Sequence, residues 1–235
     1  MPTAILIDGG FFLKRFSNCY PNRDYKDPVI AAKTAFELAL SHLEDKDSRN
    51  GKRNLYRIFF YDCPPLQKKV HRPVSKRSFN FGTSDSAIFR LKLHDELRCK
   101  RKVALRLGHV SSIGTWEMKP DPLKALLAGN IAVPQLTDDD FFYSFRQKGV
   151  DMKIGLDIAS LAFKRQVDQI ILVAGDADFV PAAKLARREG IDFILDPMCN
   201  PVPANLHEHI DGLHSTSQRP VRAASPISPP QIVAP

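Results

Sequence analysis

The chain has 235 residues, 43% of them hydrophobic, which is enough to bury a sizeable core in one domain. Its formal net charge of +8 favours a polyanionic partner, with nucleic acid preferred over a membrane surface. No apolar run approaches the roughly 18 residues of a transmembrane helix, and the start, MPTAILIDGGFF, lacks the features of a signal peptide. The four cysteines are scattered without a Cys-x-x-Cys pair, which argues against a zinc ribbon or disulfide framework and indicates the reducing cytoplasm.

The first predicted strand covers residues 4–7 and ends in Asp8, which two glycines follow. Glycine at this point lets backbone or ligand approach closely. An Asp-Gly pair is usually part of a turn, so Asp8 is either a turn or cap residue or a metal ligand at a strand end. A helix is expected to begin within residues 11–16, and a second one over 28–43, where Asp27 and the following proline mark its start.

A second strand is predicted over residues 55–61, and it too ends in an acid, Asp62. This residue is either a further site carboxylate or the first residue of a turn, because two prolines soon follow it. Helical spacing predicts a helix over residues 84–98, and alternation of apolar with basic residues predicts a strand over 103–110. Residues 111–132 are expected to form a long connection.

Residues 66–106 carry a large excess of basic over acidic side chains, with phenylalanines between them. One interpretation is a surface for the phosphate backbone of a nucleic acid, with Phe79, Phe81 and Phe89 free to stack on bases. The other is a solvated helix face beside phenylalanines of the core. The candidate nucleic-acid-binding residues are Lys68, Lys69, Arg72, Lys76, Arg77, Lys100, Arg101 and Lys102.

Three aspartates at 138–140 precede an FFYSF run that we expect to form a helix, because acids before a helix complement its dipole. Further on, the apolar residues 170–174 predict a buried strand, followed by Gly-Asp-Ala-Asp, a helix that Asp178 caps and a strand over 191–195. A last helix is expected within residues 205–213. Residues 214–235, rich in proline and serine, are expected to be disordered.

Strands alternate with helices along the chain, which predicts an α/β fold with a mostly parallel central sheet and helices on both faces. The carboxyl ends of parallel strands meet at one edge, so Asp8, Asp176 and Asp178 are expected to lie together. A further pair, Asp151 and Asp157, is six residues apart and would point about 240° apart on one continuous helix. These two converge only if the chain bends between them, or if Asp151 precedes the helix.

Several carboxylates in one pocket repel one another unless some take up protons or a cation joins them. Mg²⁺ and Mn²⁺ are hard ions that prefer carboxylate and water ligands, and no His/Cys pattern here suits zinc. Carboxylate-held divalent ions are a common arrangement for the hydrolysis of phosphodiesters. An acidic pocket beside a basic region therefore predicts a nuclease with Mg²⁺ or Mn²⁺ as its cofactor.

Three motifs carry a resemblance to a known family: ILIDGGFF at residues 5–12, KGVDMKIGLDIASLA at 148–162 and ILVAGDADFVPAAKLARREG at 171–190. They resemble the NYN domain of the PIN-like nucleases, and most of all its LabA-type bacterial group. The resemblance implies a PIN-like three-layer α/β/α sandwich over residues 1–213, with a basic insertion at about 64–130, and metal-dependent cleavage of RNA, single-stranded by preference. It assigns catalysis to Asp8, Asp151, Asp157, Asp176 and Asp178, with Asp8, Asp157, Asp176 and Asp178 around the metal.

Two positions depart from the family pattern: Phe11 stands where many relatives carry Asn, and Ala174 where they usually carry Ser. A regulatory RNA-binding protein of the same fold, with little or no turnover, is therefore an alternative. A haloacid-dehalogenase-like phosphatase is a third reading of the strand that ends in Asp8, and Gly10 weighs against it, because that fold has a second Asp at this position. The sequence leaves open RNA against DNA, endo- against exo-cleavage, and whether the protein forms a homo-oligomer.

Overall fold

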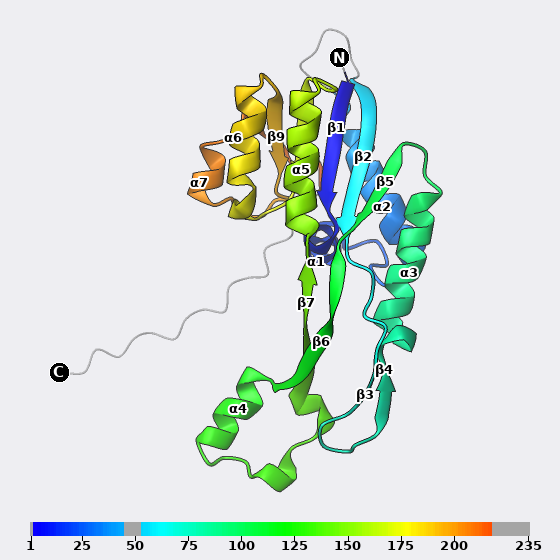
Figure 1. The fold of residues 1–235 in the computed structure, drawn as a ribbon, viewed down its shortest axis with the longest axis vertical. Helices are drawn as coiled ribbons and strands as arrows, with labels where there is room; N and C mark the ends of the chain where they lie inside the picture. Colours follow the sequence, from blue (N-terminus) through cyan, green and yellow to red (C-terminus); the bar gives the residue numbers. More distant parts are fainter. Residues whose placement is uncertain (1, 45–52, 218–235) are drawn as a thin grey trace, which may run out of the picture.

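The computed structural model describes residues 2–44 and 53–217, and it is built around a six-stranded sheet in the order β10-β9-β8-β1-β2-β5 (Figure 1). Every neighbouring pair in this sheet is parallel, so the predicted α/β fold with a parallel central sheet is confirmed. The strands are β1 (Pro2–Asp8), β2 (Asn54–Asp62), β5 (Val103–Leu107), β8 (Gln169–Val173), β9 (Asp192–Asp196) and β10 (Gly212–Leu213).

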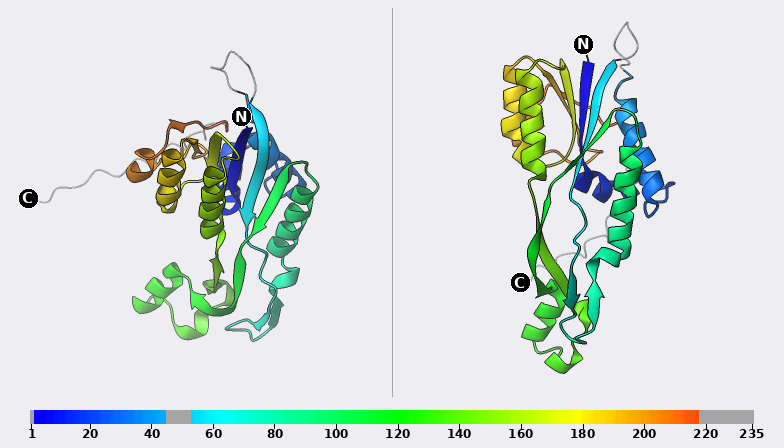
Figure 2. Two further views of the ribbon diagram at one scale, coloured as in Figure 1. Left: turned by 45° about the horizontal axis from the view of Figure 1, so that its top comes forward. Right: turned by 45° about the vertical axis from the view of Figure 1, so that its right-hand side comes forward.

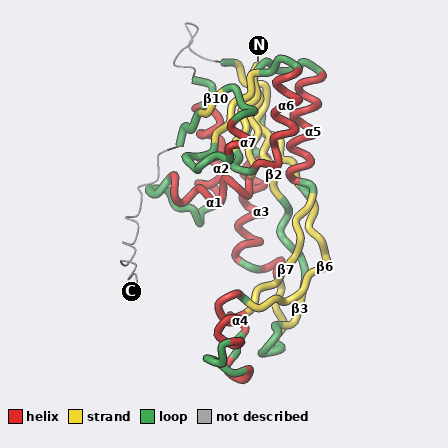
Figure 3. Tube along the Cα trace, turned by 90° about the vertical axis from the view of Figure 1, so that its left-hand side faces the viewer, coloured by secondary structure: helices red, strands yellow, loops and turns green. Residues whose placement is uncertain are grey.

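Helices cover both faces of this sheet (Figure 3). One layer consists of α1 (Gly9–Cys19), α2 (Pro28–Ser41) and α3 (Asp85–Arg98), and the other of α5 (Val150–Phe163), α6 (Val180–Arg188) and α7 (Ala204–His207). Successive side chains of β1 enter opposite layers: Ile5 and Ile7 pack against the first, and Ala4 and Leu6 against the second. Two apolar cores result, which explains why the central strands are apolar throughout rather than alternating.

A smaller lobe extends from the carboxyl edge of the sheet (Figures 1 and 2). Its main part is an antiparallel ribbon of β6 (His109–Met118) and β7 (Phe141–Lys148). The lobe also holds α4 (Pro120–Leu127) and a hairpin of β3 (Lys69–His71) and β4 (Ser78–Asn80). Short 3₁₀ turns complete it: η1 (Phe81–Thr83), η2 (Val133–Gln135) and η3 (Asp138–Asp140).

The prediction of a helix at the FFYSF run is wrong, because these residues form β7. Its first aromatic residues alternate: Phe141 and Tyr143 are partly buried, whereas Phe142 between them is exposed. That period of two suits a strand, and the partner that fixes it, β6, lies more than twenty residues earlier in the chain. The expected long connection over residues 111–132 likewise contains β6 and α4.

Two helix caps agree with the structure and one does not. Asp27 caps α2 by accepting hydrogen bonds from two backbone amides, and Ser84 caps α3. Asp178 does not cap α6, because it lies inside a 3₁₀ turn, η4 (Ala177–Phe179), and the N-cap of α6 is Phe179, which makes no side-chain cap hydrogen bond. The last helix is shorter than expected, because α7 ends at His207 and β10 follows. The stretch expected as an insertion, residues 64–130, is divided between two parts of the protein. Its helix α3 and strand β5 belong to the main layers, and the rest of the stretch belongs to the lobe. The expected disordered tail lies outside the described residues from 218 onward.

Within the described residues, no helix combines the length and the apolar character that crossing a membrane requires.

Candidate active site

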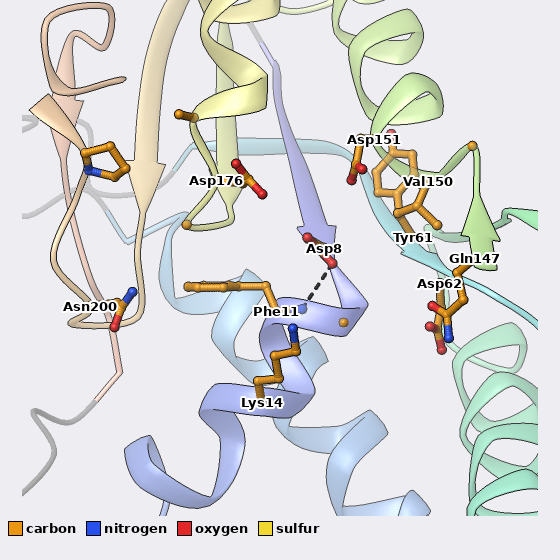
Figure 4. A pocket seen from close by; sticks show the side chains of 15 residues that line it. Asp8, Phe11, Lys14, Tyr61, Asp62, Gln147, Val150, Asp151, Asp176 and Asn200 are labelled. Atoms are coloured by element: carbon orange, nitrogen blue, oxygen red, sulfur yellow. Dashed lines mark hydrogen bonds between the residues drawn. The ribbon is translucent and has the colours of Figure 1, made fainter. Parts of the chain in front are cut away.

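The central strands β1 and β8 lie side by side, and the chain leaves them in opposite directions. After β1 it enters α1 on one face of the sheet, and after β8 it enters α6 on the other. In open parallel sheets such a switch point leaves a crevice beyond the carboxyl ends of the strands, where ligands bind. A cavity of about 540 Å³ lies at this place (Figure 4).

Asp8 is the last residue of β1 and the N-cap of α1, and its Oδ1 accepts a hydrogen bond of 3.1 Å from the Phe11 amide. The helix can start this close to β2 because residue 9 is glycine. A Cβ there would lie 2.5 Å from the Phe60 ring and 2.6 Å from the Tyr61 carbonyl oxygen. Burial raises the pKa of Asp8, the hydrogen bond from the Phe11 amide opposes this, and the charges of nearby carboxylates add to the rise.

Asp151 and Asp176 line the same cavity from two other elements. Asp151 lies in the first turn of α5, and Asp176 follows β8 and accepts a hydrogen bond of 3.2 Å from the Asp178 amide. In Figure 4 the carboxylates of Asp8, Asp151 and Asp176 point toward a common space. Desolvation raises the pKa of Asp151, and the charges of Asp176 and Asp178 raise it further. Asp178 is not among the lining residues, but its charge acts on the site.

The structure does not bring Asp157 to this cavity. The helix α5 continues unbroken past Gly155, so the 240° separation of Asp151 and Asp157 remains and only Asp151 faces the cavity. The carboxylate of Asp157 instead accepts a hydrogen bond of 2.8 Å from the Tyr61 hydroxyl and one of 3.1 Å from Nε of Arg106. The described geometry therefore supports a role in packing α5 onto the sheet.

Asp62, for which the sequence allowed either a site carboxylate or a turn residue, does line the cavity. It is only 2% exposed, and both of its carboxylate oxygens have partners: Arg90 at Oδ1, and Nε2 of His94 at 2.8 Å from Oδ2. Such partners compensate the cost of burying a carboxylate. Asp62 thus joins the end of β2 to α3 and forms part of the cavity wall.

Sequence reasoning missed Lys14, Gln147 and Asn200, which also line the cavity. Lys14 lies on one face of α1 with Gly10 and Phe11, and counting helical positions from the cap at Asp8 would have found it. Gln147 was missed because the FFYSF run before it was predicted as a helix and not as the strand that continues to Lys148. Asn200 lies in the loop after β9, where no periodic pattern indicates a direction.

Phe11 stands where the resemblance of the first motif implies Asn, and its ring covers Gly175, two residues after the end of β8. A Cβ on Gly175 would lie only 2.5 Å from Cε2 of Phe11, so the ring needs glycine there. Phe11 also lines the cavity, so an apolar ring stands where an amide would otherwise offer hydrogen bonds.

The eight basic candidates fall into two groups at opposite ends of the main sheet. Lys100, Arg101 and Lys102 lie in the turn from α3 to β5, at the amino end of that strand and away from the cavity (Figure 1). The ammonium of Lys102 donates a hydrogen bond to the Leu55 carbonyl oxygen. These three residues therefore do not surround the site.

The other five basic residues belong to the lobe that extends beyond the carboxyl edge: Lys68, Lys69, Arg72, Lys76 and Arg77. Lys68 donates hydrogen bonds of 2.8 Å to the Ser112 carbonyl oxygen and 3.0 Å to the Tyr143 hydroxyl. The guanidinium of Arg72 lies 5.0 Å from the centre of the Phe79 ring. Asp138 anchors the hairpin tip by accepting hydrogen bonds from the backbone amides of Val74 and Ser75.

The phenylalanines of the basic region are not all free to stack on bases. Phe81 packs against Phe79, Trp116 and Tyr143, with ring centres 4.9, 6.3 and 5.0 Å away. Phe89 packs against the core of the main domain. For these two rings the structure contradicts the interpretation that they stack on bases and supports the interpretation that they pack inside the protein. Phe81 holds the hairpin to the ribbon, and Phe89 fills the core.

In the described part of the chain, no three His, Cys, Asp or Glu side chains converge closely enough to hold a metal ion as they stand. The chemistry of the donors nevertheless fits a hard cation. Four aspartates line one cavity, and burial together with the charges of neighbouring carboxylates raises the pKa of both Asp8 and Asp151. A divalent ion would relieve that repulsion.

Comparison with known families gives one match: residues 111–201 match the model of the NYN domain, a family of PIN-like nucleases. The matched range includes β7, α5, β8 and α6, and with them Asp151, Asp157, Asp176 and Asp178. The parallel sheet between two helical layers agrees with a PIN-like NYN fold. No curated protein and no solved structure matches the chain.

Proposed function

We propose that this protein is a ribonuclease that hydrolyses phosphodiester bonds of single-stranded RNA and depends on Mg²⁺ or Mn²⁺. The observation that carries the proposal is the convergence of Asp8, Asp151 and Asp176, from three separate elements, on one cavity at the switch point of the sheet. The match to the NYN domain supports a nuclease. Membership of its LabA-type group is part of the same proposal.

Asp8, Asp151 and Asp176 would hold the cation, and Asp178 would add negative charge beside Asp151. When bound, a divalent ion at such a site polarises the phosphodiester and lowers the pKa of water. Asp157 is left out of this set because Tyr61 and Arg106 already engage its carboxylate.

In the hydrolysis, a water oxygen forms a bond to phosphorus while the bond from phosphorus to one ribose oxygen breaks, and that oxygen takes up a proton. The chain's own side chains hold the substrate for this step. The ammonium of Lys14 lines the cavity and would neutralise charge on the phosphate oxygens. The basic residues of the lobe, among them Lys69 and Arg77, would bind the phosphates that follow along the strand.

The location that we propose is the cytoplasm. All four cysteines are free, and Cys19 and Cys63 are buried as thiols. Burial raises the pKa of both of these thiols, which makes them unreactive. Free thiols of this kind fit a reducing compartment.

The test is to incubate purified protein with labelled single-stranded RNA in Mg²⁺, Mn²⁺ or EDTA, beside the variants Asp176→Asn and Asp95→Asn. Asp95 is an exposed acid on α3, paired with Arg98, and serves as the matched control. We expect cleavage only with metal, unchanged in the control and lowered roughly 100-fold or more in Asp176→Asn. Equal cleavage by wild type and Asp176→Asn would contradict the proposal.

A catalytically weak RNA-binding module is the second candidate function, and the Phe11 ring is the observation that favours it. The ring replaces a polar side chain at the cavity and packs on Gly175. Binding that weakens with salt but yields no product under any metal condition would select this candidate. The variant Phe11→Asn would then be the first to assay for a gain of cleavage.

A further inference from the structure

A second, smaller cavity of about 340 Å³ lies in the lobe, beside the carboxylate cavity. Its volume is at the lower end of the range for small-ligand pockets, about 300–1,000 Å³. Aromatic rings of the lobe, two prolines and aliphatic side chains line it, together with polar side chains from β7 and from the start of α3. The lining residues used below are Phe79, Phe81, Arg90, Phe145 and Gln147.

The two cavities share a wall, and two observations show it. Gln147 lines both of them. The ion pair between Arg90 and Asp62 has one partner in each, because Arg90 lines the smaller cavity and Asp62 the larger. A ligand in the smaller cavity would therefore be a direct neighbour of a phosphodiester held beside Asp8.

The alternation of β7 presents the relevant groups on one face. Tyr143, Phe145 and Gln147 are two residues apart, so their side chains point to the same side of the strand. Tyr143 packs against Phe81 with ring centres 5.0 Å apart, and its hydroxyl donates a hydrogen bond of 2.8 Å to the Gly114 carbonyl oxygen. This packing holds the strand rigidly where it forms the cavity wall.

The chemistry of the cavity fits a flat aromatic ring with polar edges. Phe145 offers an apolar ring for stacking, and the Gln147 amide offers both a donor and an acceptor. Proteins bind the bases of single-stranded RNA in this way, by stacking on aromatic rings and hydrogen bonding to base edges. Lys69, Arg72 and Arg77 on the neighbouring hairpin supply positive charge for the phosphates on either side.

We propose that this cavity binds one nucleobase of the RNA strand, adjacent to the phosphodiester bond that is cleaved. The inference rests on the proposed function and deepens it, because it makes the lobe the part of the protein that sets the position of cleavage. Gln147, at the shared wall, is the residue that reads the edge of the base.

The experiment measures binding of full-length protein to labelled RNA oligonucleotides in EDTA, by fluorescence anisotropy, so that it does not depend on cleavage. One abasic nucleotide is moved along the oligonucleotide, and each version is tested with wild type, Phe145→Ala and Gln147→Ala. The matched controls are Phe142→Ala, which changes an outward-facing ring of the same strand that is 41% exposed, and Gln166→Ala, an exposed glutamine after α5. Gln147 is exposed, so its truncation leaves folding intact even where Phe145→Ala destabilises the lobe.

We expect one abasic position to weaken RNA binding by wild type and by both controls roughly 10-fold. The same abasic position should change the affinity of Phe145→Ala and Gln147→Ala little, because these variants have already lost the contacts to that base. The same decrease at that position in all five proteins, or no sensitive position at all, would overturn the subsite. Cleavage is assayed in parallel with Mn²⁺. A sensitive abasic position that depends on Phe145 and Gln147, without any cleavage, would refute the nuclease but keep the subsite. Cleavage without such a position would refute the subsite but keep the nuclease.

Discussion

Tyr61 of β2 donates its hydroxyl hydrogen to the carboxylate of Asp157 on α5, with 2.8 Å between the oxygens. Tyr61 is fully buried, and burial followed by the charge of Asp157 raises the pKa of its hydroxyl far above the ordinary value. The hydroxyl is therefore a permanent donor. The pair joins α5 to β2 and so fixes the position of Asp151, about one and two-thirds turns earlier on the same helix, relative to Asp8.

The first prediction separates the two aspartates of α5. Asp157→Ala leaves the buried Tyr61 hydroxyl without its acceptor, so it should lower the free energy of unfolding by about 1–3 kcal/mol while cleavage persists at low temperature. Asp151→Ala removes a cavity carboxylate and should abolish cleavage with little effect on stability. Denaturant unfolding and cleavage assays on both variants measure the two effects.

A double-mutant cycle provides the control for this prediction. Combining Tyr61→Phe with Asp157→Ala removes donor and acceptor together, so the pair should cost less stability than the sum of the single changes. If the stability effects of the two changes were additive, or if metal no longer stabilised Asp157→Ala, Asp157 would instead be counted among the metal-binding residues.

The second prediction concerns the pH dependence of stability. The pKa of Asp8 is raised in the folded state, so as pH rises past the ordinary value of 3.8 the unfolded chain loses this proton first. Asp8 then favours the unfolded state, and its contribution to stability falls until pH exceeds the folded pKa. Asp8→Asn keeps an N-cap side chain, so it should melt at a higher temperature than wild type at pH 7 in EDTA, and the difference should vanish near pH 3. An Asp8→Asn variant less stable than wild type at pH 7 would contradict this account.

The third prediction is a metal effect on melting. A cation that binds only the folded protein stabilises it by about 2.7 kcal/mol at a concentration 100 times its Kd. Mn²⁺ or Mg²⁺ should therefore raise the melting temperature of wild type and of Asp95→Asn. The rise should disappear in Asp8→Asn, Asp151→Asn and Asp176→Asn. An equal rise in all five proteins would place the cation elsewhere.

The fourth prediction separates the two basic groups. The double variant Lys69→Gln/Arg77→Gln should weaken binding of single-stranded RNA and reduce the salt dependence of log K by about 0.7 for each phosphate that is no longer neutralised. The matched variant Lys100→Gln/Arg101→Gln has the same change of charge at the far end of the main sheet. It should bind as wild type does. Titrations at several salt concentrations give both slopes, and equal slopes for the two variants would show that net charge rather than position governs binding.

Much of the fold could be predicted because its signals are local. Apolar runs ending in Asp8 and in Gly175 marked the two central strands, and caps at Asp27 and Ser84 marked helix starts. Alternation of strands and helices leaves few topologies for a parallel sheet. The same rule placed Asp8 and Asp176 at one edge, since parallel strands all point the same way.

The lobe could not be predicted in this way. Whether Phe141–Lys148 forms a helix or a strand depends on its pairing with β6, more than twenty residues away, and short apolar runs carry too little periodicity to choose. The position of Gln147 between two cavities follows from that pairing. The division of the basic residues between two ends of the molecule likewise depends on where α3 and the hairpin pack.

The sequence by itself determined the parallel α/β architecture, the acidic edge of the sheet and the basic character of the chain, because each depends on local pattern or on composition. Only the tertiary structure decided which carboxylates share a cavity. Because α5 is unbroken, Asp151 faces Asp8 while Asp157 accepts a hydrogen bond from Tyr61. The packing of α3 likewise places Arg90 and His94 where they bind the carboxylate of Asp62. Side chains of the same type thus acquire different roles, because a carboxylate's role depends on its nearest partners, and these come from distant parts of the chain.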